Sequence, residues 1–308
     1  MKEKIDEIND IIINTEDAAY TYKSQRPELS DIKAVDGINS VFRRGSFTAI
    51  IGRNGSGKST FAKLLNALLL PVRGLVYVDG ISTDSEKYLW DIRRIVGMIF
   101  QNPDNQIVGT TVEEDVAFGL ENLGVEPSEI RRRVDAALCT TGIKEFMTTQ
   151  PHHLSGGQKQ KVAIAGIIAM KPECIVLDEA TSMLDPIGRN EVMAVMRQLN
   201  REENITVIHI THHMDEACFA DRVMIMDEGR MVMEGTPKEV FSQVRKVKSL
   251  GMDVPQVSEL MYELNLEGFG FPEGILDIDG AYDAIAKRIT AENNRRETSS
   301  GGHDADNR

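Results

Sequence analysis

The chain has 308 residues, 41% of them hydrophobic, and a formal net charge of -13 at pH 7, which suits one large domain or one domain with an appendage. The acidic balance argues against a nucleic-acid partner, because a protein that wraps nucleic acid needs a basic surface. No apolar run approaches the ~18 residues that span a bilayer, so membrane contact is expected only through partners.

The first residues, 1–8, alternate charges and lack the apolar core of a signal peptide. Ile5, Ile8 and Ile12 recur near helical spacing, which leaves a short N-terminal helix or a frayed end equally open. We treat residues 1–13 as an N-terminal extension.

Apolar, β-branched runs predict strands through the rest of the chain, and longer periodic segments predict helices. The predicted strands are 14–22, 35–42, 47–51, 74–80, 95–100, 174–177, 206–210, 223–227 and 230–234. The predicted helices are 61–68, 127–142, 155–170, 190–201 and 237–247. Strands interleaved with helices predict an α/β fold, with a largely parallel sheet covered on both faces.

The segment after strand 47–51 fits the phosphate-binding pattern G-x-x-x-x-G-K-[ST] at every fixed position. Its glycines let the backbone curl so that successive N–H groups point at anionic oxygens. Lys58 is expected to neutralise β- and γ-phosphates, Ser59 to ligate Mg²⁺ through its hydroxyl, and Thr60 to open a helix whose positive end adds to the site. The predicted binding residues are Gly52, Arg53, Asn54, Gly55, Ser56, Gly57, Lys58, Ser59 and Thr60.

The apolar strand 174–177 ends in two carboxylates, Asp178 and Glu179. In open α/β sheets, ligands bind at the edge formed by the carboxyl ends of the strands. Asp178 is expected to hold Mg²⁺, directly or through water, and Glu179 to polarise the attacking water as a general base. Such a pair can also be a solvated strand end, but the phosphate-binding loop in the same chain favours the catalytic interpretation.

Between these motifs, the segment 154–158 opens a helix and offers a second anion cradle from a serine and two glycine N–H groups. Its residues are Leu154, Ser155, Gly156, Gly157 and Gln158. With this segment the sequence resembles the ATP-binding-cassette (ABC) ATPases, whose signature motif is LSGGQ. In that family the signature faces the nucleotide of a second subunit, so the resemblance implies a dimer with two ATP molecules at its interface.

The resemblance also implies roles for residues that carry little signal alone. Gln101 maps to the family's Q-loop glutamine, whose amide is suited to sensing Mg²⁺ and water, and Asp185 to the D-loop that connects the two active sites. His212 maps to the switch histidine that contacts the γ-phosphate. His209 and His213 are expected to be structural.

An aromatic residue that stacks on adenine is expected at the end of the first strand. Tyr22 is the preferred candidate, because the family's aromatic closes that strand. Tyr20 stays open as a competitor, since alternation places both rings on the same side of a strand.

The resemblance covers roughly residues 14–290, and several stretches look like the ATPases of energy-coupling-factor (ECF) transporters. Segments 97–109 and 111–119 carry this likeness, and 151–153 and 179–186 look like the first of the two paired ECF ATPases. Ala180 stands where many ABC ATPases have proline, a departure that fits the subtype. In those ATPases, a short acidic segment after the Q-loop receives coupling helices of the membrane subunit.

The fold implied is a P-loop NTPase of ABC type. It has a mixed, mainly parallel sheet, an antiparallel β subdomain, a helical signature subdomain and a small C-terminal helical extension. The implied ranges are an N-terminal extension (1–13), an ABC ATPase domain (14–247), a C-terminal helical extension (248–290) and a disordered tail (291–308).

The function implied is ATP hydrolysis, with ATP and Mg²⁺ as cofactors, that drives dimer closure and uptake of vitamins or transition-metal ions. The implied partners are a second ABC ATPase (hetero- or homodimer), a transmembrane coupling subunit and a substrate-capturing membrane subunit. The chain is expected to lie peripherally at the cytoplasmic face of the cell membrane.

Three other interpretations compete with this one. A conventional ABC importer with an external solute-binding protein would have the same fold and chemistry. A soluble ABC protein acting on ribosomes or DNA is disfavoured by a single P-loop, a single signature and the acidic charge. A catalytically inactive regulatory cassette is disfavoured because every catalytic position is filled.

Overall fold

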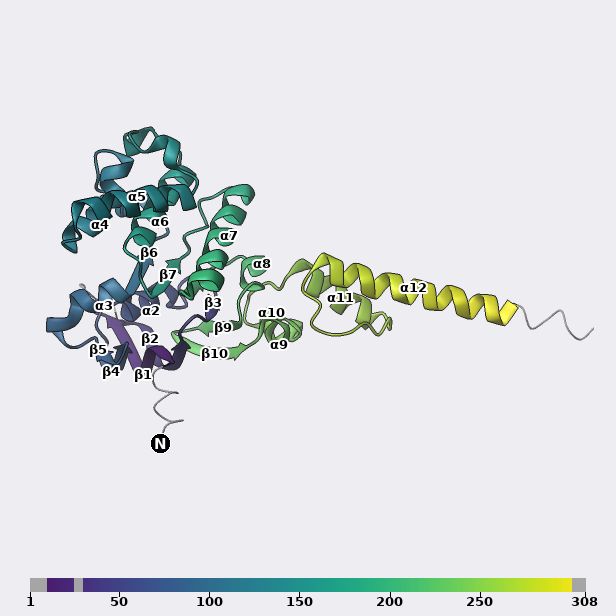
Figure 1. Cartoon of the computed structure of the whole chain (residues 1–308). Helices are drawn as coiled ribbons and strands as arrows, with labels where there is room; N and C mark the ends of the chain where they lie inside the picture. Colours follow the sequence, from purple (N-terminus) through teal and green to yellow (C-terminus); the bar gives the residue numbers. More distant parts are fainter. Residues whose placement is uncertain (1–9, 25–29, 301–308) are drawn as a thin grey trace, which may run out of the picture. The chain divides into compact units, whose positions relative to one another are not determined.

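The computed structural model describes residues 10–24 and 30–300, and for residue 292 and residues 295–300 it describes the backbone (Figure 1). The chain divides into two compact units, Met1–Glu234 and Gly235–Arg308. The boundary expected at residue 248 between the ATPase domain and its extension stays a prediction about function. The helix expected at 237–247 is two helices, α9 (Pro237–Phe241) and α10 (Val244–Ser249), and both belong to the second unit.

The larger sheet of the first unit has the strand order β10-β9-β3-β8-β7-β6. The strands are β3 (Phe47–Ile51), β6 (Val96–Ile99), β7 (Cys174–Asp178), β8 (Thr206–Ile210), β9 (Arg222–Asp227) and β10 (Arg230–Gly235). Strand β3 pairs in parallel with β8 and β9, and β7 pairs in parallel with β6 and β8. Every residue of β3, β7 and β8 is buried, which explains their nearly continuous apolar runs. The predicted α/β fold with a mainly parallel sheet is confirmed.

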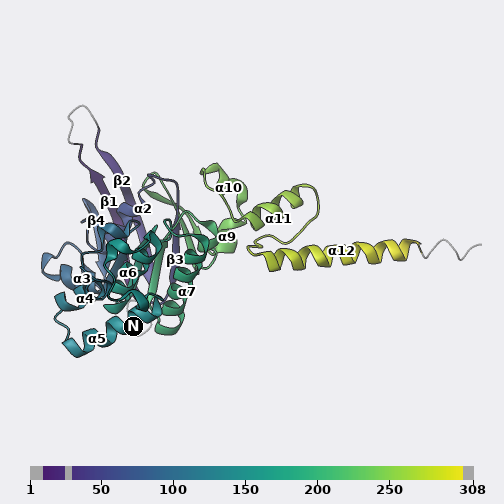
Figure 2. The same ribbon diagram turned by 90° about the horizontal axis from the view of Figure 1, so that it is seen from above.

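The second sheet is antiparallel, in the order β2-β1-β4-β5. Figure 2 shows its two long strands, β1 and β2, side by side. Its strands are β1 (Ile11–Tyr22), β2 (Ile32–Arg43), β4 (Arg73–Val78) and β5 (Ile81–Ser82). Strand β1 thus begins inside the predicted N-terminal extension, most of which (1–9) lies outside the described residues. Its pairing with β2 shifts register between Ala18 and Tyr20 and again between Tyr20 and Thr21.

Helices of the first unit follow the predicted order, together with three that the sequence did not predict, α3, α4 and α8. The bounds are α2 (Lys58–Leu65), α3 (Leu89–Ile95), α4 (Val112–Asn122), α5 (Pro127–Thr140), α6 (Gly156–Ala169), α7 (Pro186–Glu203) and α8 (Met214–Ala217). Short 3₁₀ turns lie at Glu86–Tyr88, Pro103–Asn105, Lys144–Phe146 and Pro151–His153.

Two hydrophobic cores organise this unit. One joins both sheets to α2 around side chains such as Phe42, Phe61 and Ile50. The other lies among α4, α5 and α6 and includes Val116 and Leu138. The second core makes these helices a subdomain of their own, which confirms the predicted helical signature subdomain.

The second unit contains α9, α10, α11 (Gln256–Leu266) and α12 (Ile278–Ser300), and Met261, Phe271 and Ala281 form its small core. The structure corrects the predicted tail, because residues 291–300 continue α12 and 301–308 lie outside the described residues. The Ala, Glu and Arg residues of this stretch are strong helix formers, so a polar composition does not end the helix. Among the described residues, no helix has the length and apolar character to cross a membrane.

Candidate active site

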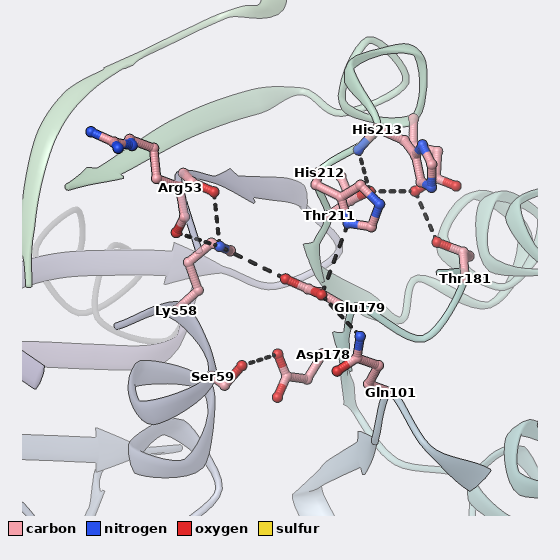
Figure 3. A network of polar contacts seen from close by, with 12 residues as sticks. Arg53, Lys58, Ser59, Gln101, Asp178, Glu179, Thr181, Thr211, His212 and His213 are labelled. Atoms are coloured by element: carbon pink, nitrogen blue, oxygen red, sulfur yellow. Dashed lines mark hydrogen bonds and ion pairs between the residues drawn. The ribbon is translucent and has the colours of Figure 1, made fainter. Parts of the chain in front are cut away.

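The phosphate-binding loop joins the buried strand β3 to α2, and its backbone needs glycine at Gly57. That residue has φ +101°, and a Cβ built there would lie 1.9 Å from the carbonyl oxygen of Ala34. Lys58 opens α2 and is buried, with Nζ donating to the carbonyl oxygens of Gly52 at 2.8 Å and Arg53 at 3.1 Å (Figure 3). The loop therefore curls around its own lysine.

The two carboxylates at the end of β7 meet this loop. Asp178 Oδ1 accepts a hydrogen bond from Ser59 Oγ at 2.8 Å, and Glu179 Oε1 lies 3.8 Å from Lys58 Nζ. Glu179 has φ +51°, a left-handed conformation that costs a non-glycine residue about 1–2 kcal/mol. Its backbone N–H donates to the carbonyl oxygen of Ile210 at 3.0 Å, which helps to hold that turn. The turn brings the Glu179 side chain to the lysine.

Burial shifts the pKa values of Lys58 and Asp178 in opposite directions. Burial lowers the pKa of the Lys58 ammonium, and the nearby Glu179 and Asp178 charges oppose that shift. Burial raises the pKa of Asp178, and the Ser59 hydrogen bond opposes that shift. Because both charged forms lose solvation here, a further charged partner at this site gains more than it would in water.

Two residues from neighbouring strands converge on Glu179. Gln101, after β6, donates from Nε2 to Glu179 Oε2 at 3.3 Å. His212, after β8, places Nδ1 3.9 Å from the same oxygen. The three predicted catalytic residues thus lie together, because β6, β7 and β8 are parallel neighbours that end at the same edge.

An open depression lies above this cluster. It is lined by Tyr22, Ile32, Ala34, Asn54, Gly55, Gly57, Lys58, Ser59, Thr60, Gln101 and Glu179. Sequence reasoning missed Ile32 and Ala34, which belong to β2 and carry no motif. Of the other predicted loop residues, Gly52 and Arg53 hold the lysine, and Ser56 is buried.

The structure separates the two tyrosines that alternation could not. Tyr22 is 39% exposed and its hydroxyl lies 3.3 Å from Thr60 Oγ1, at the rim of the depression. Tyr20 packs against the main core. The two rings still meet edge to face, with centroids 5.0 Å apart. The two tyrosines differ in burial and not in the side of the strand they share, and the position of Tyr22 supports it as the adenine platform.

The signature segment lies apart from this depression. Ser155 is the N-cap of α6 and forms a capping box with Gln158: its Oγ accepts from the Gln158 N–H, and Gln158 Oε1 accepts from the Ser155 N–H. Ser155 and Gly156 are exposed, and none of the five signature residues, all of which are described, lines the depression. Asp185 is likewise exposed and caps α7, with Oδ1 accepting from the Gly188 N–H at 2.8 Å. One copy of the chain does not bring the signature to the phosphate loop.

The residues at the loop fit a magnesium site built partly from ligands outside the protein. Ser59 and Asp178 offer oxygen atoms, which Mg²⁺ prefers, and Gln101 adds an amide nearby. No group of three or more His, Cys, Asp or Glu in the described residues could hold a metal ion alone.

His209 and His213 occupy structural positions, as expected. His209 is fully buried, with Nε2 2.8 Å from Glu216 Oε2. The His213 ring contacts the Arg189 guanidinium. Glu216 was missed by sequence reasoning.

Comparison with known proteins gives one consistent family. A family model described as "ABC transporter" matches residues 35–182. The chain is 54% identical over 276 residues to the energy-coupling factor transporter ATP-binding protein EcfA1 of Clostridium perfringens, covering 90% of this chain and 98% of that protein. It is 55% identical over 276 residues to EcfA1 of Caldanaerobacter subterraneus, with 90% and 99% coverage.

Solved structures agree. The structure of cbiO1 from Clostridium perfringens, described as part of the ABC transporter complex cbiONQ, superposes with a TM-score of 0.69 and 40% identity over 82% of this chain and 99% of that chain. The dimeric cassette MJ0796, described as a bacterial ABC transporter cassette, gives a TM-score of 0.68 and 32% identity over 73% and 98%.

Proposed function

Because the chain belongs to the ABC transporter ATPases, and within them to the EcfA1 ATP-binding proteins of energy-coupling factor transporters, we propose a mechanism for the residues of its site. The chain is an ABC ATPase that couples ATP hydrolysis to transport. The observation that carries the mechanism is the convergence of Lys58, Gln101 and His212 on the Glu179 carboxylate.

In the proposed reaction, Glu179 is the general base that takes a proton from the attacking water. Gln101 and His212 hold its carboxylate and face the γ-phosphate, while Lys58 neutralises the β- and γ-phosphates. Ser59 and Asp178 would hold Mg²⁺, which supplies charge neutralisation on the phosphate oxygens when bound. The open depression beside Tyr22 receives the adenine.

The Glu179→Gln variant tests this assignment. It should retain ATP binding and lose turnover by about 10²–10⁴-fold, since the amide cannot accept the proton. Glu173→Gln is the matched control, because Glu173 is an exposed carboxylate at the opposite end of β7 that pairs with Arg44. Near-normal hydrolysis by Glu179→Gln would remove Glu179 from the role of base.

The site is completed by a second ATPase subunit in this proposal. The exposed cradle at Ser155 would contact ATP held by the phosphate loop of the partner subunit, and Asp185 would link the two sites. The dimeric MJ0796 structures, one described as bound to ADP and Pi, support this arrangement. Closure follows ATP binding because the closed dimer alone supplies both contact sets, which gives ATP different affinities for the two states.

Gly156→Ala separates the partner contact from folding. No heavy atom among the described residues lies within 4 Å of a Cβ built at Gly156, so the variant should fold with a free energy of unfolding equal to that of wild type or higher by up to about 1 kcal/mol. ATP hydrolysis by the assembled dimer should nevertheless fall by ~10-fold or more, because the methyl group obstructs the cradle. Unchanged hydrolysis would argue against a phosphate of the partner site at this position.

The proposed assembly contains a second ATPase, a transmembrane coupling subunit and a substrate-capturing membrane subunit. In it, this chain lies peripherally at the cytoplasmic face of the membrane and is held there by its partners. The names of the EcfA1 relatives and of the cbiONQ complex support it. Identification of the proteins that co-purify from detergent-solubilised membranes distinguishes it from a conventional importer, which would bring no coupling subunit shared among several substrate-binding proteins.

A further inference from the structure

A buried carboxylate, Glu216, lies next to the proposed site without taking part in it. Its side chain lies in the short helix α8 and is 6% exposed. One oxygen, Oε2, accepts from Thr211 Oγ1 at 2.6 Å and Thr181 Oγ1 at 3.0 Å, and lies 2.8 Å from His209 Nε2. A single atom therefore joins the loop after β7, the strand β8 and the loop after β8.

The two threonines flank the reacting groups. Thr181 comes two residues after Glu179, and Thr211 comes directly before His212. Glu179 Oε2 and His212 Nδ1 lie 3.9 Å apart. The hydroxyls of Thr181 and Thr211 both donate to Glu216 Oε2. This shared acceptor connects the segment that carries the proposed base, Glu179, to the segment that carries His212.

Thr211 also connects Glu216, through His213, to α7, the helix that Asp185 caps. Thr211 Oγ1 also accepts the His213 N–H at 3.0 Å. The Arg189 guanidinium on α7 lies within 3.0 Å of both ring nitrogens of His213, and the backbone N–H of Arg189 donates to the carbonyl oxygen of Asp185 at 2.9 Å in the first turn of that helix. The loop that carries His212 and His213 is thus held by Glu216 through Thr211 and by Arg189 through His213.

The negative charge of Glu216 strengthens the hydrogen bonds that it accepts from Thr181, Thr211 and His209. Burial by itself raises the pKa of the carboxyl, but hydrogen bonds from His209, Thr211 and Thr181 outweigh it and hold the pKa at about 2. The group is therefore ionised at neutral pH, and hydrogen bonds to an ionised acceptor are shorter and about twice as strong as neutral ones. Neutralising it without changing its size should loosen both loops.

We propose that Glu216 is a positioning residue for ATP hydrolysis, which sets the distance between Glu179 and His212 through Thr181 and Thr211. It acts through these loops and not on the nucleotide. The inference rests on the roles proposed above for Glu179 and His212.

The test measures kcat and KM for ATP on the full chain in the complex with which it co-purifies. Glu216→Gln should lower kcat by about 10–100-fold, because a small misplacement of catalytic groups has effects of this size, and change KM less than about threefold. Thr211→Val should also lower kcat, whereas Thr211→Ser, which keeps the hydroxyl, should stay within about twofold of wild type.

The matched control is Glu239→Gln in the second unit. Glu239 accepts from the Thr236 N–H at 2.7 Å and from its hydroxyl at 3.0 Å, so it is also a carboxylate bonded to a threonine, but in the cap of α9. Its kcat should match wild type. In the combined Glu216→Gln, Thr211→Val variant, the threonine change should add less than about twofold, because the two residues act as one unit.

The outcomes separate the two proposals. Loss of kcat that follows thermal stability in every variant, including Thr211→Ser and Glu239→Gln, would make Glu216 a purely structural residue and overturn the inference. A Glu216→Gln kcat within twofold of wild type beside an inactive Glu179→Gln would overturn the inference and leave the proposed function intact. An active Glu179→Gln would remove Glu179 from the role of base, which overturns the proposed mechanism and the inference that rests on it. If Glu216→Gln does not fold, the valine and serine variants at Thr211 and Thr181 decide the question by the same comparison.

Discussion

Alanine at Gly57 should destabilise the fold far more than alanine at Gly55, although both belong to the same loop. Gly57 has φ +101° and Gly55 has φ +82°, conformations that side chains rarely adopt. A Cβ at Gly57 would lie 1.9 Å from the Ala34 carbonyl oxygen, whereas no heavy atom of the described residues lies within 4 Å of a Cβ at Gly55. The pair therefore separates backbone strain from steric clash.

The expected magnitudes follow from these distances. Each variant loses about 1–2 kcal/mol by placing alanine at a positive φ. Gly57→Ala must also move a backbone carbonyl of β2 by about 1 Å to reach the 3.0 Å that real Cβ contacts respect, and overpacking of that kind costs typically 1–3 kcal/mol. We expect about 1 kcal/mol for Gly55→Ala and roughly 3 kcal/mol for Gly57→Ala.

Urea unfolding of both variants measures the difference, and calorimetric titration with ATP reports the loop itself. ATP affinity should fall by at least ~10-fold in Gly57→Ala, because the N–H groups that would cradle the phosphates shift with the backbone. Equal free energies of unfolding for the two variants would show that β2 moves away from the new Cβ at no cost in stability. That result would refute the steric part of the reasoning.

Two further predictions concern Glu216 and Tyr22. The folded pKa of Glu216, about 2, lies below its usual 4.5, so the stabilisation is present above pH 4.5 and is lost as the pH falls toward 2. The difference in unfolding free energy between wild type and Glu216→Gln should narrow by on the order of 3 kcal/mol over that range in urea titrations, and a constant difference would contradict it. Tyr22→Ala should raise KM for ATP about 10-fold, while Tyr22→Phe keeps the ring and stays near wild type. Tyr20→Ala should instead lower thermal stability, and a raised KM in that variant would reverse the assignment.

Features that depend on consecutive residues were predictable from the sequence. The strands predicted at 47–51 and 206–210 coincide with β3 and β8, and the phosphate loop and the carboxylates follow buried strands as expected. The gathering of Gln101 and His212 around Glu179 depends on the order of β6, β7 and β8, which no local pattern contains. It entered through family resemblance, and the structure supplies its physical basis.

The misses have physical causes. Helix α4 had a readable start, since Thr111 and Glu114 form a capping box that the sequence shows as T-x-x-E. The choice between Tyr20 and Tyr22 depended on which ring packs against the core and which lies exposed beside Thr60, and strand periodicity, which places both on one side, cannot reveal that. Glu216 bonds a threonine 35 positions away, and such a partner leaves no trace in local composition.

Neither the backbone conformation nor the packing within the described chain requires glycine at Gly156, which suggests a functional reason for it. At Gly57 the fold itself demands glycine, because a side chain would strike β2. Gly156 lies in the first turn of α6 without a positive φ, and nothing in the described chain approaches its Cβ position. Glycine in a helix costs up to about 1 kcal/mol relative to alanine, so stability within one copy gives no reason for it. The remaining physical reason is close approach by a group outside the copy, and an exposed helix start with free N–H groups favours an anion there. The phosphate of a nucleotide held by a second subunit fits that requirement, in agreement with the proposal that the signature of one subunit and the phosphate loop of another form one site.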